Sequence, residues 1–180
     1  MTSSSLQGPL PDSVVSLLTN TNFVHLGTCL NNTPHVSLMN YTFITPTETY
    51  QKSSNDYFIL LATPKDTNKY RNLTQNPVCS ILVHDWTTSG KVDSSEQSGH
   101  LLKLLMGLNQ NELSDLSCTL TGHVAKFLED SEESQYYKDL HLKNNPNAKC
   151  FIEGDNVAMV LIKIDGSKVV DSNNNISQYN

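Results

Sequence analysis

The chain has 180 residues, and its 18 aspartates and glutamates outnumber its 12 lysines and arginines, which leaves a formal net charge of -6 at pH 7. This length suits a single domain, residues 1–180, with a hydrophobic core of its own. Binding of nucleic acid needs clustered lysine and arginine, so the acidic balance argues against a nucleic-acid partner.

The sequence gives no sign of a membrane or secretory route. No stretch approaches the ~20 apolar residues of a membrane span. The N-terminal segment has neither the basic region nor the apolar core of a signal peptide. We therefore expect a cytoplasmic protein, with the nucleus also open to it by diffusion, and no membrane partner.

The cysteines and histidines lack the spacings of metal sites. The four cysteines form no C-x-x-C pair and lie in or beside apolar runs, which predicts buried, reduced thiols. The six histidines show no H-x-x-H or H-x-x-x-H spacing, so we expect no metal site.

The N-terminal part of the chain predicts a helix followed by a hairpin. A helix beginning at Asp12 carries its apolar residues on one face. A strand over residues 23–30 comes next, and the Asn31–Asn32 pair after it tolerates positive φ, which predicts a turn. The partner is a long strand over residues 35–44.

Two apolar strands at the centre of the chain enclose one short helix. The strands cover residues 57–62 and 78–84, and the helix ends near Asn76 because Pro77 disfavours its continuation. Residues 87–99 are polar and rich in serine and glycine, which predicts a loop.

The next segments alternate between apolar and polar character. The leucine-rich residues 101–108 are too apolar for a free surface, so they should cover the barrel or a second subunit. A strand over residues 117–127 follows, in which Gly122 marks a bulge or a close approach. A helix over residues 129–142 carries His141 late, where the helix dipole favours positive charge.

The last segment predicts a hairpin of residues 151–152 and 157–164, with turns at Gly154–Asp155 and Asp165–Gly166 and a short final strand at Val169–Val170. In all, six or seven strands lie mostly in neighbouring antiparallel pairs, with helices inserted. There is no βαβ alternation and no G-x-G-x-x-G. We expect a mainly β fold with added helices, a closed or split antiparallel barrel of six to seven strands.

The start of the central helix carries a candidate anion site. Backbone N–H groups are unpaired at a helix N-terminus, and the helix dipole makes that end positive. Thr63, Thr67, Asn68 and Lys69 gather there, and two hydroxyls, an amide and an ammonium suit a phosphate. Ordinary capping is the alternative, with Asp66 or Thr67 as N-cap and Lys69 in solvent.

These segments resemble the pyridoxamine 5'-phosphate oxidase family in their order and spacing. The resemblance rests on the strand over residues 35–40, on the turn from Ala62 to Lys69 and on the strand after Asn76–Pro77. It extends from about residue 11 to about residue 141 and implies the family's FMN-binding split barrel. The chain resembles a small fungal-type member with residues 87–99 as an inserted loop.

The resemblance implies that the strand beginning at residue 35 contacts the flavin. The residues whose backbone would lie along the flavin ring and ribityl chain are His35, Val36, Ser37 and Leu38. A core strand without a ligand explains the valine and leucine equally well.

The resemblance also assigns the phosphate end. Ala62 and Thr63 correspond to the strand end at the ribityl-phosphate, and Thr67, Asn68 and Lys69 correspond to the residues at the phosphate itself. Members often have serine, arginine and lysine at these last three positions, so asparagine removes one cation and lowers the expected phosphate affinity.

The family resemblance further implies a homodimer with FMN at the subunit interface. Ser117 corresponds to a polar residue that reaches the flavin from the other subunit, and residues 101–108 would be buried between subunits. Trp86 comes at the end of a core strand beside the loop, where an aromatic ring could stack near a flavin, although packing at the barrel mouth is the favoured interpretation.

The departures from the family concern the substrate. The oxidases end in a segment with tryptophan and arginine that holds the substrate phosphate, whereas this chain ends without either, and Arg71 is its sole arginine. We therefore expect an FMN-dependent oxidoreductase acting on an unassigned small molecule, with no catalytic residue assigned. The alternatives are a flavin- or small-ligand-binding module without turnover, or a purely structural barrel.

Overall fold

The computed structural model describes residues 9–85, 116–171 and 173–180. Its helices and strands are α1 Asp12–Asn20, β1 Phe23–Leu30, β2 Thr33–Asn40, β3 Thr42–Ile44, β4 Phe58–Pro64, α2 Asn68–Gln75, β5 Val78–His84, β6 Leu116–Leu128, α4 Glu132–Asn144, α5 Lys149–Ile152, β7 Val157–Asp171 and β8 Ile176–Tyr179. Short 3-10 turns cover Pro46–Glu48, Tyr50–Lys52 and Pro146–Ala148.

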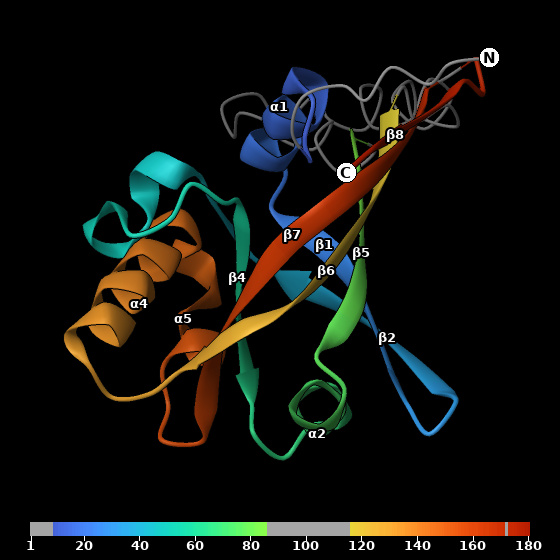
Figure 1. Cartoon of the computed structure of the whole chain (residues 1–180). Coiled ribbons are helices and arrows are strands. Elements are labelled where there is room, and N and C mark those ends of the chain that lie inside the picture. The colour runs from blue at the N-terminus through green and yellow to red at the C-terminus, as the bar shows by residue number, and fades with distance from the viewer. Residues whose placement is uncertain (1–8, 86–115, 172) are drawn as a thin grey trace, which may run out of the picture.

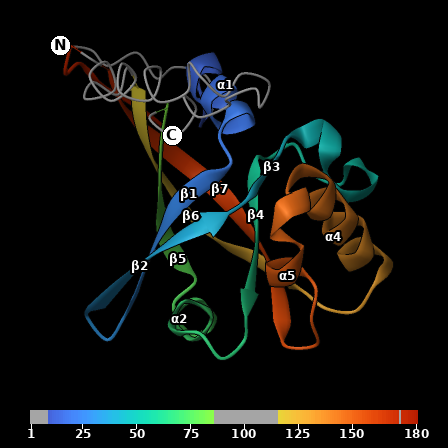
Figure 2. The same ribbon diagram turned by 180° about the vertical axis from the view of Figure 1, so that it is seen from behind.

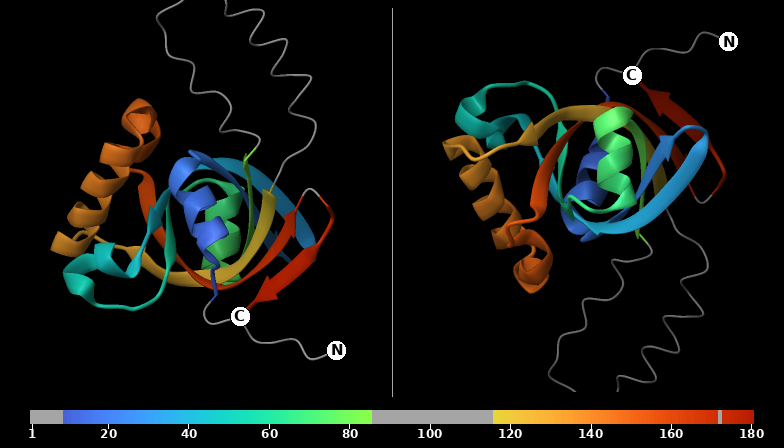
Figure 3. Two further views of the ribbon diagram at one scale, coloured as in Figure 1. Left: turned by 90° about the horizontal axis from the view of Figure 1, so that it is seen from above. Right: turned by 90° about the horizontal axis from the view of Figure 1, so that it is seen from below.

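One antiparallel sheet contains all the described strands. Its order is β2-β1-β5-β6-β7-β4-β3, with β8 paired to β7. The sheet curls into a half-barrel with α1 at one end and α2 at the other, while α4 and α5 lie beside β4 (Figures 1 and 3). The expected mainly β split barrel with added helices is confirmed, and β8 is a strand that the sequence did not predict.

The first helix and the first hairpin form as their residues predict. Val14, Leu17 and Leu18 recur at helical spacing and are the buried face of α1. Asn31 and Asn32 have φ of 50° and 61°, and this turn pairs Leu30 with Thr33.

Strand β4 is buried on both faces because it lies between two hydrophobic clusters. Ile59 and Leu61 belong to the barrel core, whereas Leu60 and Ala62 belong to a second cluster with residues of α4 and α5. A strand covered on both sides needs apolar residues at every position, which accounts for the uninterrupted apolar run.

The long strand expected over residues 35–44 is interrupted at Tyr41, and the interruption forms the split of the barrel. Strands β2 and β3 lie at opposite ends of the sheet order, so the chain crosses from one sheet edge to the other within one residue. The Tyr41 hydroxyl anchors this crossing by donating to the backbone oxygen of Leu18 at 2.7 Å. Figure 2 shows β2 running towards β3 and β4 at this point.

The turn expected at Asp165–Gly166 is instead a bulge inside β7. Thr121 pairs with Gly166 and Gly122 pairs with Ile164, which leaves Asp165 as the extra residue. A Cβ at Gly122 would lie 2.4 Å from the Lys163 carbonyl oxygen, so the predicted close approach is confirmed.

The predicted strand at residues 151–152 is wrong, because these residues end α5. Ile152 is buried in the second cluster, whereas Phe151 is 63% exposed. Cys79 and Cys118 are buried as expected, but Cys150 on α5 is exposed. Trp86 and residues 87–99 and 101–108 lie outside the described residues. None of the described helices is both long and apolar enough to cross a bilayer.

Candidate functional site

A cavity of about 230 Å³ lies at the split of the barrel. Its lining comes from β2, β4, the first turn of α2, α4 and the α5 region: Leu38, Met39, Asn40, Ala62, Thr63, Pro64, Lys69, His141, Ala148, Phe151 and Ile152. Figure 2 shows these elements around the split. Of the residues predicted from the sequence, this cavity brings together Leu38, Ala62, Thr63 and Lys69.

Lys69 is a cation without a counter-ion in the described part of the chain. It is half-buried in the first turn of α2 and forms no ion pair with any described carboxylate. Burial lowers the pKa of its amine below the ordinary value of 10.5. The alternative of a fully solvated Lys69 does not describe this half-buried amine, and an anion in the cavity would supply a partner.

Thr67 is the N-cap of α2, so the capping interpretation holds for this residue. Its Oγ1 accepts from the Tyr70 N–H at 3.4 Å and donates to the Pro64 carbonyl oxygen at 2.8 Å. The Thr63 hydroxyl lies 3.1 Å from Thr67 Oγ1 and 3.5 Å from the Pro64 carbonyl oxygen, so its proton also has an acceptor within the protein. Both hydroxyl protons are thus spent within the protein.

What remains for an anion at this helix end is the backbone. The N–H groups of Asn68 and Lys69 donate to none of the described residues. With the Lys69 ammonium, they are the donors that the start of α2 offers to a ligand.

Two of the predicted residues line a different hollow. His35 and Asn68 face a space of about 470 Å³ between the β1–β2 hairpin and α2, and Arg71 lines it too. Arg71 donates to Asn68 Oδ1 at 3.1 Å. The sole arginine therefore lies away from the cavity that Lys69 lines, as its helical spacing predicts.

Two apolar residues of β2, Val36 and Leu38, are not part of a core within one chain, whereas Met39 is buried in the barrel core. Val36 and Leu38 are 68% and 59% exposed, so the alternative of a core strand is contradicted. They lie on the same sheet face as Leu82 and Val78 of β5, because directly paired residues share a face. We call Val36, Leu38, Val78 and Leu82 the outer patch; Ser37 faces the other way, with Oγ 3.3 Å from His35 Nδ1.

Ser117 does not reach the cavity of its own chain. It pairs with His84, which ends β5, whereas α2 precedes the opposite end of that strand. Its assignment to the flavin of a second subunit stays a prediction.

His141 is the residue of the cavity that the sequence did not indicate. It is 1% exposed, and burial lowers the pKa of its imidazole to about 4. A positive charge on His141 is therefore contradicted, since a buried neutral ring occupies the position, while Lys143 is a basic residue of the last turn of α4. The only sequence signal is the spacing of His141 and Asn145, one helical turn apart, which is too common to be specific.

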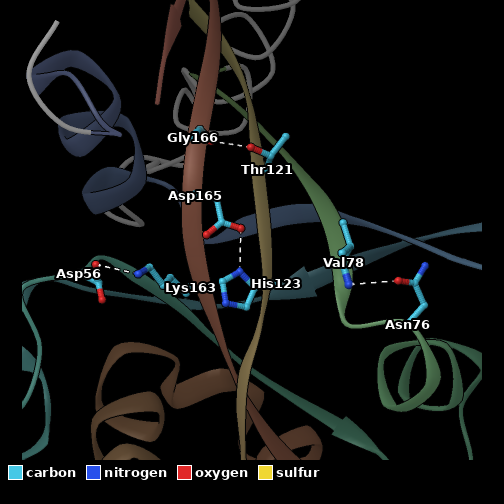
Figure 4. A network of polar contacts seen from close by, with 8 residues as sticks. All are labelled: Asp56, Asn76, Val78, Thr121, His123, Lys163, Asp165 and Gly166. Carbon is cyan, nitrogen blue, oxygen red and sulfur yellow. Dashed lines mark hydrogen bonds and ion pairs between the residues drawn. The ribbon is translucent and has the colours of Figure 1, made fainter. Parts of the chain in front are cut away.

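A second polar cluster lies along β6 and β7 (Figure 4), and none of its residues lines the cavity. His123 of β6 contacts the carboxylate of the bulged Asp165 at 2.7 Å, and Lys163 contacts Asp56 at 3.1 Å. These side chains are more than a third exposed, so such pairs contribute little stability.

Comparison with known proteins identifies the family. The chain is 34% identical over 184 residues to a pyridoxamine 5'-phosphate oxidase homolog of Saccharomyces cerevisiae, covering 92% of each chain. Its fold is similar to that of a Mesorhizobium loti FAD-binding protein (TM-score 0.56, 13% identity, 87% of this chain and 89% of that one). It is also similar to a heme-binding protein of Mycobacterium smegmatis (TM-score 0.60, 17% identity, 94% and 58%). The model of the pyridoxamine 5'-phosphate oxidase family matches residues 10–169, and the chain therefore belongs to this family.

Proposed function

We propose that this protein binds FMN at the split of the barrel, with the phosphate of the cofactor at the first turn of α2. The observation that carries the proposal is the cavity itself, in which Lys69 has no described carboxylate partner. The backbone N–H of Lys69 itself also donates to none of the described residues. Donors that have no acceptor among the described residues call for an oxyanion.

The surroundings of the cavity suit the rest of a flavin. Leu38 and Ala62 offer an apolar wall, and the exposed β2 strand leads away from the phosphate end. Membership of the family and the likeness to a FAD-binding protein support a flavin over another phosphate ester. When bound, the flavin would supply the redox chemistry, and the protein would bind it and orient it.

The size of the cavity supports a site completed by two chains. Pockets that enclose ligands of this kind measure roughly 300–1,000 Å³, more than the volume of about 230 Å³ at the split. The outer patch beside it carries exposed valine and leucine, which a second copy would cover. We therefore propose a homodimer with FMN at its interface.

The substrate of such an oxidoreductase is a separate matter. The side chain of Arg71 lines the other hollow and is bonded to Asn68, so the cavity has no guanidinium for a second phosphate. We expect weak or undetectable oxidation of pyridoxine 5'-phosphate, followed as formation of pyridoxal 5'-phosphate. A flavin-binding module without turnover is the alternative, and reduction of bound flavin by candidate donors separates the two.

Calorimetric titration of the purified protein with FMN and with riboflavin tests the cofactor. We expect FMN to bind about 10- to 100-fold more tightly, since hydrogen bonds to a charged group are worth ~1.5–3 kcal/mol each. Equal affinity for the two flavins would contradict a phosphate site at α2. Absence of binding by either would contradict the flavin.

A further inference from the structure

The buried ring of His141 has one nitrogen engaged by the protein and one that is not. Its Nδ1 lies 2.9 Å from Thr42 Oγ1 and 3.2 Å from Asn145 Nδ2. Its Nε2 makes no hydrogen bond to any residue that the structure describes, and the ring lines the cavity at the split. The edge of the ring that carries Nε2 is therefore the edge left for the cavity.

The orientation of Asn145 follows from two backbone carbonyls. Its Nδ2 lies 3.0 Å from the Tyr41 oxygen and 3.1 Å from the His141 oxygen. An amide oxygen at that place would face two acceptors, so the nitrogen must be there and must donate. The Asn145 Nδ2 group is thus the donor in each of its hydrogen bonds in this network.

The proton of Thr42 then decides which histidine nitrogen is protonated. Thr42 is 2% exposed, so its hydroxyl proton needs an acceptor within the protein. Its side-chain partners are Asn145 Nδ2, which is a donor, and His141 Nδ1. Thr42 therefore donates to Nδ1, and the single proton of the neutral imidazole must sit on Nε2.

We propose that His141 donates an Nε2–H hydrogen bond to a phosphate oxygen of the ligand in the cavity and so acts with Lys69 to select a phosphorylated flavin. The identity of the ligand rests on the proposed function. The small cavity favours the phosphate end, because a space of about 230 Å³ shared by Lys69 and His141 suits an oxyanion with its linker better than a tricyclic ring.

A neutral donor has a specific advantage beside Lys69. A charged imidazolium would repel the lysine, whereas a neutral ring adds a directed donor without that cost. Burial lowers the pKa of His141 to about 4, so the ring keeps this form throughout the neutral range. The ability of His141 to donate from Nε2 to an oxyanion should therefore stay the same near pH 7.

Two substitutions separate the ligand contact from the structural contact. In His141→Asn, the short amide can still meet Thr42 where Nδ1 lies, but nothing replaces Nε2–H. In His141→Gln, the longer amide reaches the Nε2 position and offers an N–H there, but the contact with Thr42 is lost. If His141 only stabilised the fold, His141→Gln would be the more damaging substitution, because it loses the contact with Thr42. If His141 binds the ligand, His141→Asn would lower FMN affinity more, because it loses the donor at the Nε2 position.

Titration of the wild type and both variants with FMN and with riboflavin is the test. We expect His141→Asn to weaken FMN binding about 10- to 100-fold with riboflavin unchanged. His141→Gln should keep the preference for FMN and lose thermal stability instead. Equal weakening of FMN and riboflavin by His141→Asn would place the donor at the ring or ribityl chain and overturn the proposal. An unchanged FMN affinity would overturn it as well.

A spectroscopic readout keeps this inference separate from the flavin assignment. Long-range ¹H–¹⁵N spectra of the ligand-free protein should show the His141 proton on Nε2, and inorganic phosphate should shift that resonance. A shift with phosphate in a protein that binds no flavin would refute the proposed function and leave the donor in place. A proton on Nδ1, or an Nε2 resonance indifferent to both phosphate and FMN, would overturn the donor.

Discussion

The outer face of β6 and β7 and the cavity at the split each carry a histidine and a lysine, yet their polar groups are satisfied in opposite ways. On the outer face, His123 and Lys163 each have a carboxylate partner and lie in partial contact with water. In the cavity, Lys69 has no described carboxylate, and the Nε2 of buried His141 has no described acceptor. Unpartnered donors inside a cavity indicate a ligand, whereas paired charges outside do not.

The largest expected effect concerns the pH dependence of stability. His141 has an ordinary pKa of 6.5 and a folded pKa of about 4, so between these values the unfolded chain binds a proton that the folded chain does not. The contribution of His141 to the free energy of unfolding is fully present above pH 6.5. It falls by about 3 kcal/mol as the pH drops towards 4.

Urea unfolding of the wild type and His141→Asn at pH 7 and pH 4 measures this difference. The variant should lose about 3 kcal/mol less than the wild type over that range. If the wild type and His141→Asn lost the same free energy of unfolding between pH 7 and pH 4, burial would not hold the His141 ring neutral. The contrast between the buried cavity and the exposed outer face would then be contradicted.

The next effect concerns the two lysines. Lys69→Ala should weaken FMN binding about 10- to 100-fold with little change for riboflavin, because only FMN offers an anion to the unpaired ammonium. Lys163→Ala is the matched control, since that lysine is already paired with Asp56. A titration in which both variants bind FMN equally well would show that pairing does not distinguish a binding lysine from a structural one.

A smaller effect tests whether the outer patch is covered by a second copy. Val36→Asp should raise the dissociation constant of the dimer at least about 10-fold, because it removes an apolar contact and buries a charge. Ile176→Asp on β8, also an exposed apolar residue, should leave it unchanged. Sedimentation of the wild type as a 20.0 kDa species alone at micromolar concentration would contradict the dimer.

The smallest effect is expected on the outer face itself. Asp165→Asn removes the charge opposite His123 and should change the free energy of unfolding by less than about 1 kcal/mol, because both side chains are more than a third exposed. FMN affinity should stay the same. A loss of FMN binding in this variant would mean that the two regions are coupled through the sheet.

The candidate site was partly predictable, and the limits have physical causes. Lys69, Thr63 and Ala62 are close in sequence and meet through a strand, a turn and a helix start, so their proximity is local. Asn68 is the direct neighbour of Lys69, yet it lines the other hollow, because successive residues of a helix point in different directions. The exposure of Val36 likewise depends on the sheet around it, since alternation alone does not say which face is covered.

The sequence by itself determined the local features of this protein. Asparagines that tolerate positive φ made the first turn, Thr67 capped α2, Pro77 ended it, and Gly122 allowed the close approach of β7. Each depends on the conformational preference of one or two residues.

Only the tertiary structure decided the chemistry of the cavity. Thr42 and His141 are 99 residues apart, and their contact exists because the chain crosses the split of the barrel beside α4. Burial then keeps the imidazole neutral, and the proton of Thr42 selects its tautomer. Desolvation and hydrogen-bond partnership belong to the packed assembly, so no pattern along the chain encodes them.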